Sequence, residues 1–203
     1  MALSALALMF HAFLVIDMKR ILYSATFILF AAGISLQLTT ADKLFVFESG
    51  SIHFFSETPV ENIEAETKAL AAALKPATKE FAFIVQIDGF KFEKKLMQEH
   101  FNENYMESEK YPKATFAGTI VEDIDLLKEG KYTLSAKGKL NIHGVERERT
   151  ISINVKNKGG KLHYNSNFQV KLVDHNIEVP SIVVANIAEI IDVKVQGVLK
   201  EKE

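Results

Sequence analysis

The chain has 203 residues, enough for one domain or two small ones, and its 48% apolar and 25% charged residues are typical of a folded globular protein. Lysine and arginine number 24 against 26 acidic residues, so the basic surplus expected of a nucleic-acid-binding protein is absent. The lack of cysteine excludes disulfides, thiolate metal sites, a cysteine nucleophile and a lipid-modified N-terminal cysteine.

Residues 1–41 are predicted to be a leader that lies outside the fold. They contain two apolar runs, residues 2–16 and 21–36, each shorter than the ~20 residues that a membrane-spanning helix needs. The positively charged pair Lys19 and Arg20 stands directly before the second run, as in the first part of a secretory signal peptide.

Small residues follow the second apolar run, with Thr39 and Ala41 at the two key positions of a cleavage site before Asp42. Cleavage there leaves residues 42–203, with 22 basic and 25 acidic residues, and predicts a periplasmic or secreted protein. Met18 also suits a start codon, which would make the preceding residues an upstream extension. The alternative interpretation is a retained N-terminal membrane anchor.

Beyond the leader, apolar and polar residues alternate, which is typical of strands with one buried and one solvent-facing side. The alternating segments are residues 81–87, 116–120, 132–142, 151–155, 162–170 and 191–195. Residues 158–161 (KGGK) and 143–145 (HGV) separate strands and are predicted to be tight turns. About eight such strands predict an all-β, antiparallel barrel, because closure removes exposed sheet edges.

Two segments depart from this alternation. Residues 94–103 place Leu96, Met97 and Phe101 at helical spacing, which predicts one short amphipathic helix. Residues 63–74 (IEAETKALAAAL) are ambiguous, because alanine favours a helix by propensity whereas the alternation permits a strand. Gly138 lies inside a predicted strand, where we interpret it as a bend in the barrel rather than part of a phosphate site.

No motif indicates catalysis, a metal centre or a cofactor. G-x-S-x-G, H-E-x-x-H and P-loop patterns are absent, and the histidines of the predicted barrel lie too far apart for a local ligand pair. His143 and His163 fall on polar sides of strands and are interpreted as solvated rings; His100, near Glu103, is interpreted as a helix surface contact. The sequence therefore predicts a protein that is not an enzyme.

Phenylalanine is abundant, with fifteen residues, and many of these lie on the apolar sides of predicted strands. A barrel of about eight strands can be filled by its own side chains or can hold one small ligand, and both remain open here. Strand phase points ten residues to the interior: Phe83, Val85, Phe116, Ile120, Leu134, Leu140, Ile153, Tyr164, Phe168 and Val193. Leu96, Met97 and Phe101 of the helix are expected to join them.

Several strings resemble the YceI-like family. Residues 96–101 (LMQEHF) followed by residues 111–116 (YPKATF) resemble its "hL…FF…yP…tF" segment. Residues 138–145 (GKLNIHGV) are similar to its "GxLTIHGV" strand and turn, and residues 168–177 (FQVKLVDHNI) to its "F.V.L.DFGI" stretch. The resemblance spans roughly residues 47–199.

The resemblance implies an extended, lipocalin-like β-barrel, exported from the bacterial cytoplasm, whose apolar tunnel binds a polyisoprenoid or similar amphiphilic lipid without catalytic residues. The interior residues named above are then the predicted lipid-binding set, and a homodimer and transient membrane contact are compatible with it. Asn141 stands where the family often has threonine, and His175-Asn176 replaces its common Phe-Gly. The alternative function is a structural or interaction barrel with a filled core and no ligand.

Overall fold

A computed structural model describes residues 43–179 and 187–202; the predicted leader and its cleavage site lie outside these residues. Within them, no helix is long and apolar enough to cross a membrane. The strands, in chain order, are β1 (Phe45–Glu57), β2 (Asn62–Thr67), β3 (Leu70–Lys75), β4 (Glu80–Gln86), β5 (Lys91–Phe92), β6 (Lys113–Ile120), β7 (Gly130–Ile142), β8 (Val145–Lys158), β9 (Lys161–Lys171) and β10 (Ile190–Glu201).

One helix accompanies the strands. It begins as α2 (Lys95–His100) and continues without a break into a π-helical turn, η2 (Phe101–Tyr105), in which the Met106 amide donates to the Phe101 carbonyl at 2.9 Å. The prediction of one short helix near residues 94–103 is confirmed. Two 3₁₀ turns, η1 (Ile87–Gly89) and η3 (Leu172–His175), complete the regular elements of the described residues.

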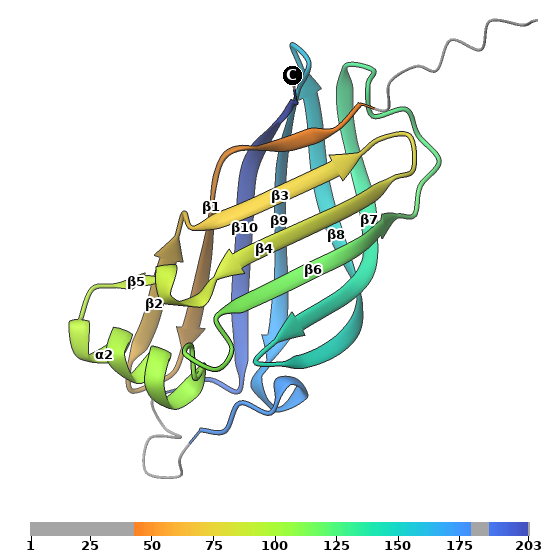
Figure 1. The fold of residues 1–203 in the computed structure, drawn as a ribbon. Coiled ribbons are helices and arrows are strands. Elements are labelled where there is room, and N and C mark those ends of the chain that lie inside the picture. Colours follow the sequence, from red (N-terminus) through yellow and green to blue (C-terminus); the bar gives the residue numbers. More distant parts are fainter. Residues whose placement is uncertain (1–42, 180–186, 203) are drawn as a thin grey trace, which may run out of the picture. The chain divides into compact units, whose positions relative to one another are not determined.

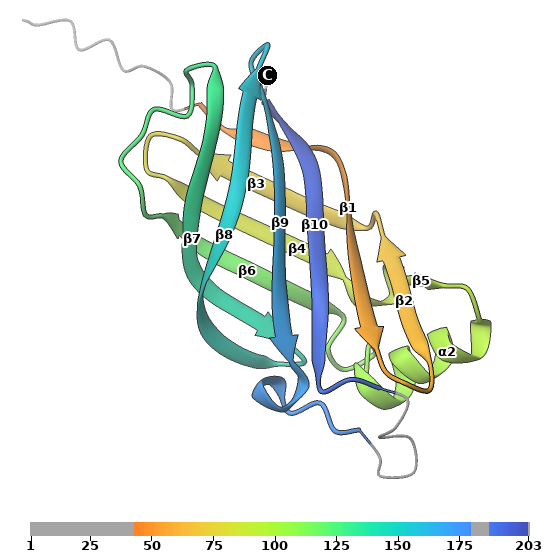
Figure 2. The same ribbon diagram turned by 180° about the vertical axis from the view of Figure 1, so that it is seen from behind.

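Eight strands form a closed antiparallel ring in the order β1–β10–β9–β8–β7–β6–β4–β3, and β3 returns to β1. Strands β7 to β10 and β1 lie side by side on one wall, and β3, β4 and β6 cross it on the opposite side, in front in Figure 1 and behind in Figure 2. The short strands β2 and β5 continue the sheet from the second half of β1. The predicted all-β barrel of about eight strands is confirmed.

The barrel closes because long strands bend. β7 curves along its length, and only its second half pairs with β6 (Figure 1). Gly118 and Gly138 are opposite one another in this pair, and a Cβ on either glycine would collide with the backbone of the other strand. The close approach therefore requires glycine, which agrees with the interpretation of Gly138 as a bend residue.

Both predicted tight turns are present. Gly159–Gly160 joins β8 to β9 with φ of 59° and 73°, a geometry that glycine adopts without strain and that matches the twist of a two-residue hairpin. His143–Gly144 joins β7 to β8 with similar positive φ values. The ambiguous segment at residues 63–74 falls in β2 and β3, which shows that pairing with β1 and β4 overrides the helical propensity of alanine.

The two ends of the barrel carry different elements and are called here the loop end and the helix end. The loop end carries the β6–β7 connection (residues 121–129), the Gly159–Gly160 turn, the start of β1 and the end of β10 (Figure 1). The helix end carries α2, η2 and η3. Each end has its own buried apolar cluster, the larger one including Phe45 and Leu162, the smaller one including Ile87 and Met106.

Candidate functional site

The barrel encloses an apolar cavity of about 380 Å³ that reaches from the helix end to the loop end. Every second residue of β9 lines it, from Leu162 near the loop end to Val170, and Leu172 of η3 continues this wall at the helix end. At ~3.3 Å per residue, the strand part of this wall, from Leu162 to Val170, extends over roughly 26 Å. The interior is therefore a long apolar channel rather than a compact pocket.

The structure brings twelve of the thirteen predicted interior residues to this cavity. They are Phe83, Val85, Met97, Phe101, Phe116, Ile120, Leu134, Leu140, Ile153, Tyr164, Phe168 and Val193. Their placement agrees with the strand phase read from the sequence. Their role in binding a lipid stays a prediction.

Leu96 does not belong to this set, and its expected position is wrong. Its side chain is 61% exposed and does not line the cavity. Leu96 and Met97 are consecutive in a helix, about 100° apart, so only one of them can share a face with Phe101. Met97, four residues before Phe101, is on that face.

Several inward-pointing side chains are only half-buried. Phe83, Phe116, Ile153 and Phe168 are in the interior of the ring, yet each keeps an accessible surface because it faces the cavity. A barrel filled by its own side chains would bury them completely. This observation weighs against the filled-core alternative.

Sequence reasoning missed an aromatic group at the helix end. Phe54, Phe90 and Phe92 line the cavity together with Phe101, and their ring centroids lie 5.0 to 5.6 Å apart in the contacting pairs. Alternation around Lys91 would have placed Phe90 and Phe92 on one side of a strand. The two-residue length of β5 weakens that signal.

Charged and polar groups of the lining gather at the helix end. The Glu61 carboxylate lines the cavity and accepts a hydrogen bond from the Lys94 ammonium at 2.8 Å. His100 and Tyr105, both on the helix, also line this part. Partial burial raises the pKa of the Tyr105 phenol, so this hydroxyl keeps its proton and can donate a hydrogen bond.

Beyond the helix end, the described residues that line the channel carry no charge. The Ser166 hydroxyl donates to the Ser152 carbonyl at 2.6 Å and is satisfied within the protein. The Tyr164 hydroxyl is enclosed without a hydrogen-bond partner, above the backbone of Gly197, and burial raises the pKa of Tyr164 to about 12. A ligand in this part of the channel therefore meets apolar surface.

Two histidine rings connect segments at the helix end through hydrogen bonds. The His143 ring contacts the Glu107 carboxylate through Nε2 (2.8 Å) and the His175 carbonyl through Nδ1 (3.2 Å). Because both partners accept hydrogen bonds, the ring donates to both only when both nitrogens carry protons. His143 has a side chain only 10% exposed, so its interpretation as a solvated ring is wrong; His163 is exposed.

The His175 ring is completely buried below the turn between β7 and β8. Its Nδ1 is 3.1 Å from the Val145 carbonyl, and its Nε2 has no partner. Burial lowers the pKa of His175, so the folded protein favours the neutral ring. In the described part of the chain, no group of three or more histidine or acidic side chains is arranged to hold a metal ion.

A closed antiparallel barrel of eight strands around an apolar cavity defines a lipocalin-like β-barrel. Residues 40–199 match the model of the YceI-like domain, and the chain belongs to this family. No curated protein matches the chain.

Solved structures share the fold at low sequence identity. A polyisoprenoid binding domain from Saccharophagus degradans is 12% identical, with a TM-score of 0.68 over 78% of this chain and 98% of that one. Burkholderia cenocepacia BcnA is 18% identical, with a TM-score of 0.61 over 73% and 95% of the two chains. A Campylobacter jejuni YCEI protein is 18% identical, with a TM-score of 0.54 over 68% and 83%.

Proposed function

We propose that the barrel binds an amphiphilic lipid, of which a polyisoprenoid is the best candidate, with the tail in the channel and the head group at the helix end. The proposal rests above all on the shape of the cavity, a long apolar channel whose charged lining groups, among the described residues, lie at one end. Membership of the YceI-like family and the polyisoprenoid binding domain among the similar structures support the proposal.

The driving force is the removal of apolar surface from water, worth ~25 cal/mol per Å². A linear prenyl tail matches the channel because it is narrow, apolar along its whole length and flexible enough to follow the wall. Met97 adds a side chain that adapts to irregular apolar surfaces. Loss of tail freedom and of overall motion offsets part of this gain.

The helix end suits the head group for a reason of charge. Glu61, Lys94, His100 and Tyr105 can form hydrogen bonds there, whereas the channel wall has its polar atoms satisfied or enclosed. A polar head placed deeper would lose its water without gaining partners, at a cost of ~1–3 kcal/mol for each unpaired group.

The proposal is tested with the Phe116→Gln variant. Glutamine removes an aromatic wall residue of the channel, so we expect lipid that co-purifies with the wild type, measured by native mass spectrometry and organic extraction, to be lost. Phe55→Gln is the matched control, because Phe55 follows the cavity-lining Phe54 in β1 but does not line the cavity itself. Equal lipid content in both variants and the wild type would contradict the proposal.

The proposed activity is binding and carriage rather than catalysis, and a filled-core interaction barrel is the alternative. Repeated purification of ligand-free wild type that also fails to bind added prenyl lipid would favour that alternative. The expected homodimer and transient membrane contact stay predictions, to be checked by the mass of the native particle and by sedimentation with lipid vesicles.

We further propose export to the periplasm or the medium, with cleavage near Ala41. The order of Lys19–Arg20, the apolar run and Thr39-x-Ala41 supports it. N-terminal sequencing of protein from the cell envelope should begin at Asp42. An intact N-terminus at Met1 or Met18 would instead indicate a retained anchor.

A further inference from the structure

At the loop end, the β6–β7 connection contributes one side chain to the cavity lining. Leu126 is only 2% exposed, lines the cavity and belongs to the larger buried cluster. Its neighbours in the same loop point elsewhere, since Val121 and Leu127 are 56% and 43% exposed and do not line the cavity. Ile124 of the same loop packs, half-buried, against this cluster but does not line the cavity, so Leu126 is the residue of this connection that reaches the channel.

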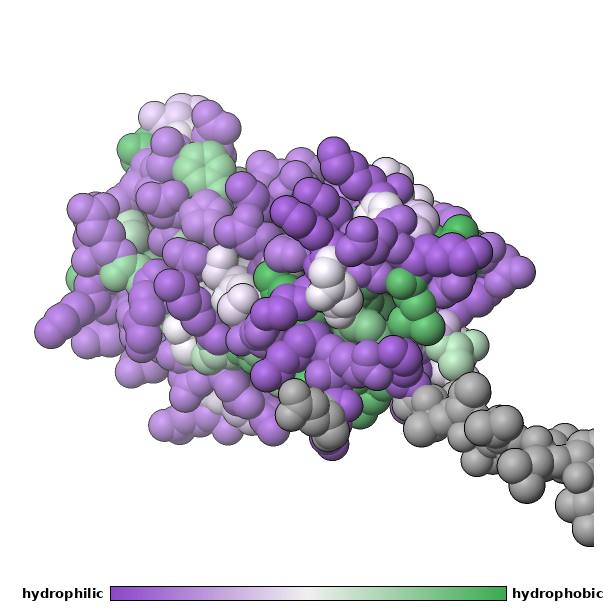
Figure 3. Space-filling view, turned by 90° about the horizontal axis from the view of Figure 1, so that it is seen from above, coloured by the Kyte–Doolittle hydropathy of each residue, from purple (hydrophilic) through white to green (hydrophobic). Residues whose placement is uncertain are grey.

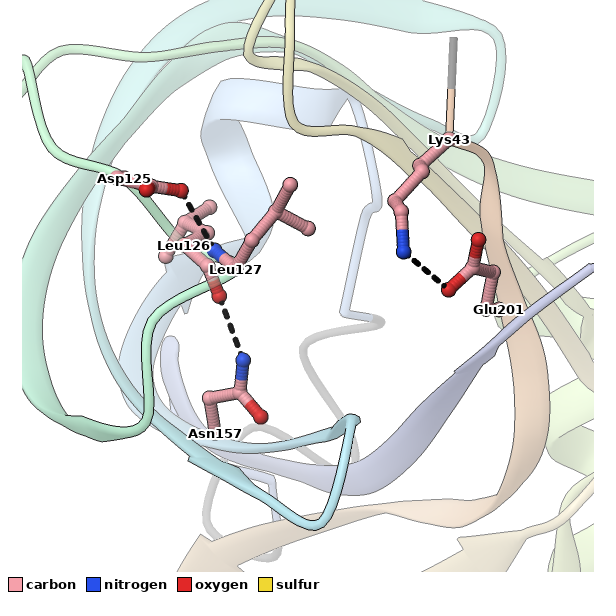
Figure 4. Close-up of polar contacts among 6 residues, drawn as sticks. All are labelled: Lys43, Asp125, Leu126, Leu127, Asn157 and Glu201. Carbon is pink, nitrogen blue, oxygen red and sulfur yellow. Dashed lines mark hydrogen bonds and ion pairs between the residues drawn. The ribbon is translucent and has the colours of Figure 1, made fainter. Parts of the chain in front are cut away.

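A buried amide holds this loop in place. The Asn157 side chain, in a residue only 4% exposed, donates to the Leu126 carbonyl at 2.9 Å (Figure 4). Within the loop, the Leu127 amide donates to the Asp125 carboxylate at 2.9 Å, which fixes the turn that directs Leu126 inward (Figure 4). Asn157 makes its bond from β8, so the loop is attached directly to the barrel wall.

Acidic side chains fix both flanks of the loop. The Glu122 carboxylate accepts from the Ser135 amide at 2.8 Å, and the Glu129 carboxylate accepts from the Gly159 amide at 2.8 Å. Asp123 pairs with Lys79 at 2.7 Å. Seen from this end, mostly hydrophilic residues cover the molecule, with a smaller apolar group between them (Figure 3). The loop is therefore a fixed closure rather than a loosely placed segment.

We propose that Leu126 is the plug that sets the length of lipid tail the channel accepts, with Asn157 as its positioning residue. The inference rests on the proposed function, because it assigns the inner end of the same channel. The loop end suits a length limit because Leu126 shares a buried cluster with Phe45, Leu162 and Leu199, all at most 4% exposed. A tail that enters from the helix end would then meet Leu126 at the far end of the channel, beside Leu162 and Leu199 of the lining.

The test compares Leu126→Ala with Leu127→Ala, an identical change one residue later whose side chain does not line the cavity. The probes are prenyl alcohols that differ by one isoprene unit, and the dissociation constant is measured for each. Leu126→Ala should bind best a tail at least one unit longer than the wild type prefers. Its affinity ratio for the longer over the shorter tail should rise at least ~10-fold, the size of effect known for pocket changes of this scale.

Leu127→Ala should keep the wild-type length preference. Leu126→Val is a milder variant that keeps most of the buried side chain, and it should shift the preference in the same direction by less. Leu126→Phe should shift the preference to shorter tails. An unchanged length preference in a folded Leu126 variant would overturn the inference, whereas failure of every probe to bind the wild type would refute the proposed function itself.

Asn157→Ala tests the positioning role. Release of the Leu126 carbonyl should speed amide hydrogen exchange across residues 121–129 and broaden the range of tail lengths that bind. A purely structural role for Asn157 would lower stability and leave the ranking of the prenyl alcohols as it is in the wild type. That second result would remove Asn157 from the inference.

Discussion

The two ends of the barrel differ in how tightly their side chains are packed. At the loop end, an extensive cluster of buried residues, including Phe45, Leu162 and Leu199, packs around a plug held by a buried amide. At the helix end, a smaller cluster coexists with half-buried phenylalanines, a methionine and an ion pair on the cavity edge. One end is built to stay closed, and the other offers adaptable apolar surface beside polar groups.

This contrast has a general basis in packing. A fully buried side chain without free space resists movement, because any displacement creates a void or a clash. Half-buried side chains at the edge of a cavity lose less when they move. We therefore expect stability to reside mainly at the loop end and adaptation to a ligand mainly at the helix end.

The largest expected effect is on stability at the loop end. Leu162 is 1% exposed, so Leu162→Ala should lower the free energy of unfolding by ~2–5 kcal/mol. Met97→Ala, which truncates a half-buried side chain at the helix end, should cost ~1 kcal/mol or less. Urea unfolding of the purified variants measures both, and similar costs would remove the distinction between the ends.

The next effect concerns acid and the buried His175 ring. Burial lowers the pKa of His175 below its ordinary value of 6.5, despite Asp174 nearby, which acts in the opposite direction, while Arg147 adds to the lowering. The unfolded chain takes up the proton first, so this ring should reduce stability as the pH falls below about 6.5 and toward the lowered pKa, and should have no such effect at higher pH.

His175→Gln should remove this pH-dependent loss, measured by thermal unfolding at a series of pH values. His163→Gln is the control, because His163 is an exposed ring on β9. An identical loss of stability on acidification in the wild type and in His175→Gln would show that other groups carry it.

A smaller effect is expected where the helix is fastened to the barrel. Glu107→Ala removes the acceptor of the His143 ring and should cost ~1–2 kcal/mol, with faster amide exchange confined to α2 and η2. Glu103→Ala, at an exposed position of the same helix, should change neither measurement. Exchange that speeds up equally at the loop end would show that the two ends open together.

The smallest effect is expected at the loop-end surface. Lys43 and Glu201 form an ion pair of 2.8 Å between half-exposed side chains, and such pairs contribute ~0–1 kcal/mol (Figure 4). Glu201→Gln should therefore shift the unfolding midpoint only slightly, and the shift should vanish at high salt. A large loss would mean that this pair is part of the closure of the ring.

Much of the barrel could be predicted from local pattern, because each strand of the ring has one side that faces the cavity and one that faces water. Alternation alone placed Phe83, Phe116 and Phe168 inside. The prediction of an interior position for Leu96 failed for a local reason too. Two consecutive apolar residues in a helix do not by themselves show which one faces the interior. The packing of α2 against the neighbouring strand β5 decides which of the two side chains faces the interior.

What could not be predicted depends on contacts between distant segments. The plug at Leu126 lies in a loop that mixes acidic residues with Val121, Ile124 and Leu127, so the sequence does not show which apolar side chain turns inward. The bond within the loop to the Asp125 carboxylate and the Asn157 amide, 31 residues later, hold Leu126 in that position. His143 continues the polar side of its strand, but Glu107, two residues after η2, and His175 of η3 supply its partners. Such arrangements need the tertiary structure.

The ion pair between Lys43 and Glu201 also shows that the first and last strands of the ring begin and end side by side. The arrangement of the strands in the ring should therefore not depend on where the chain begins and ends. A circular permutant, with a short linker from Lys202 to Lys43 and new termini between Gly159 and Gly160, should rebuild the same barrel, because a side chain added at either glycine would meet no atom within 4 Å. New termini there would open the chain beside the plug and leave the helix end intact.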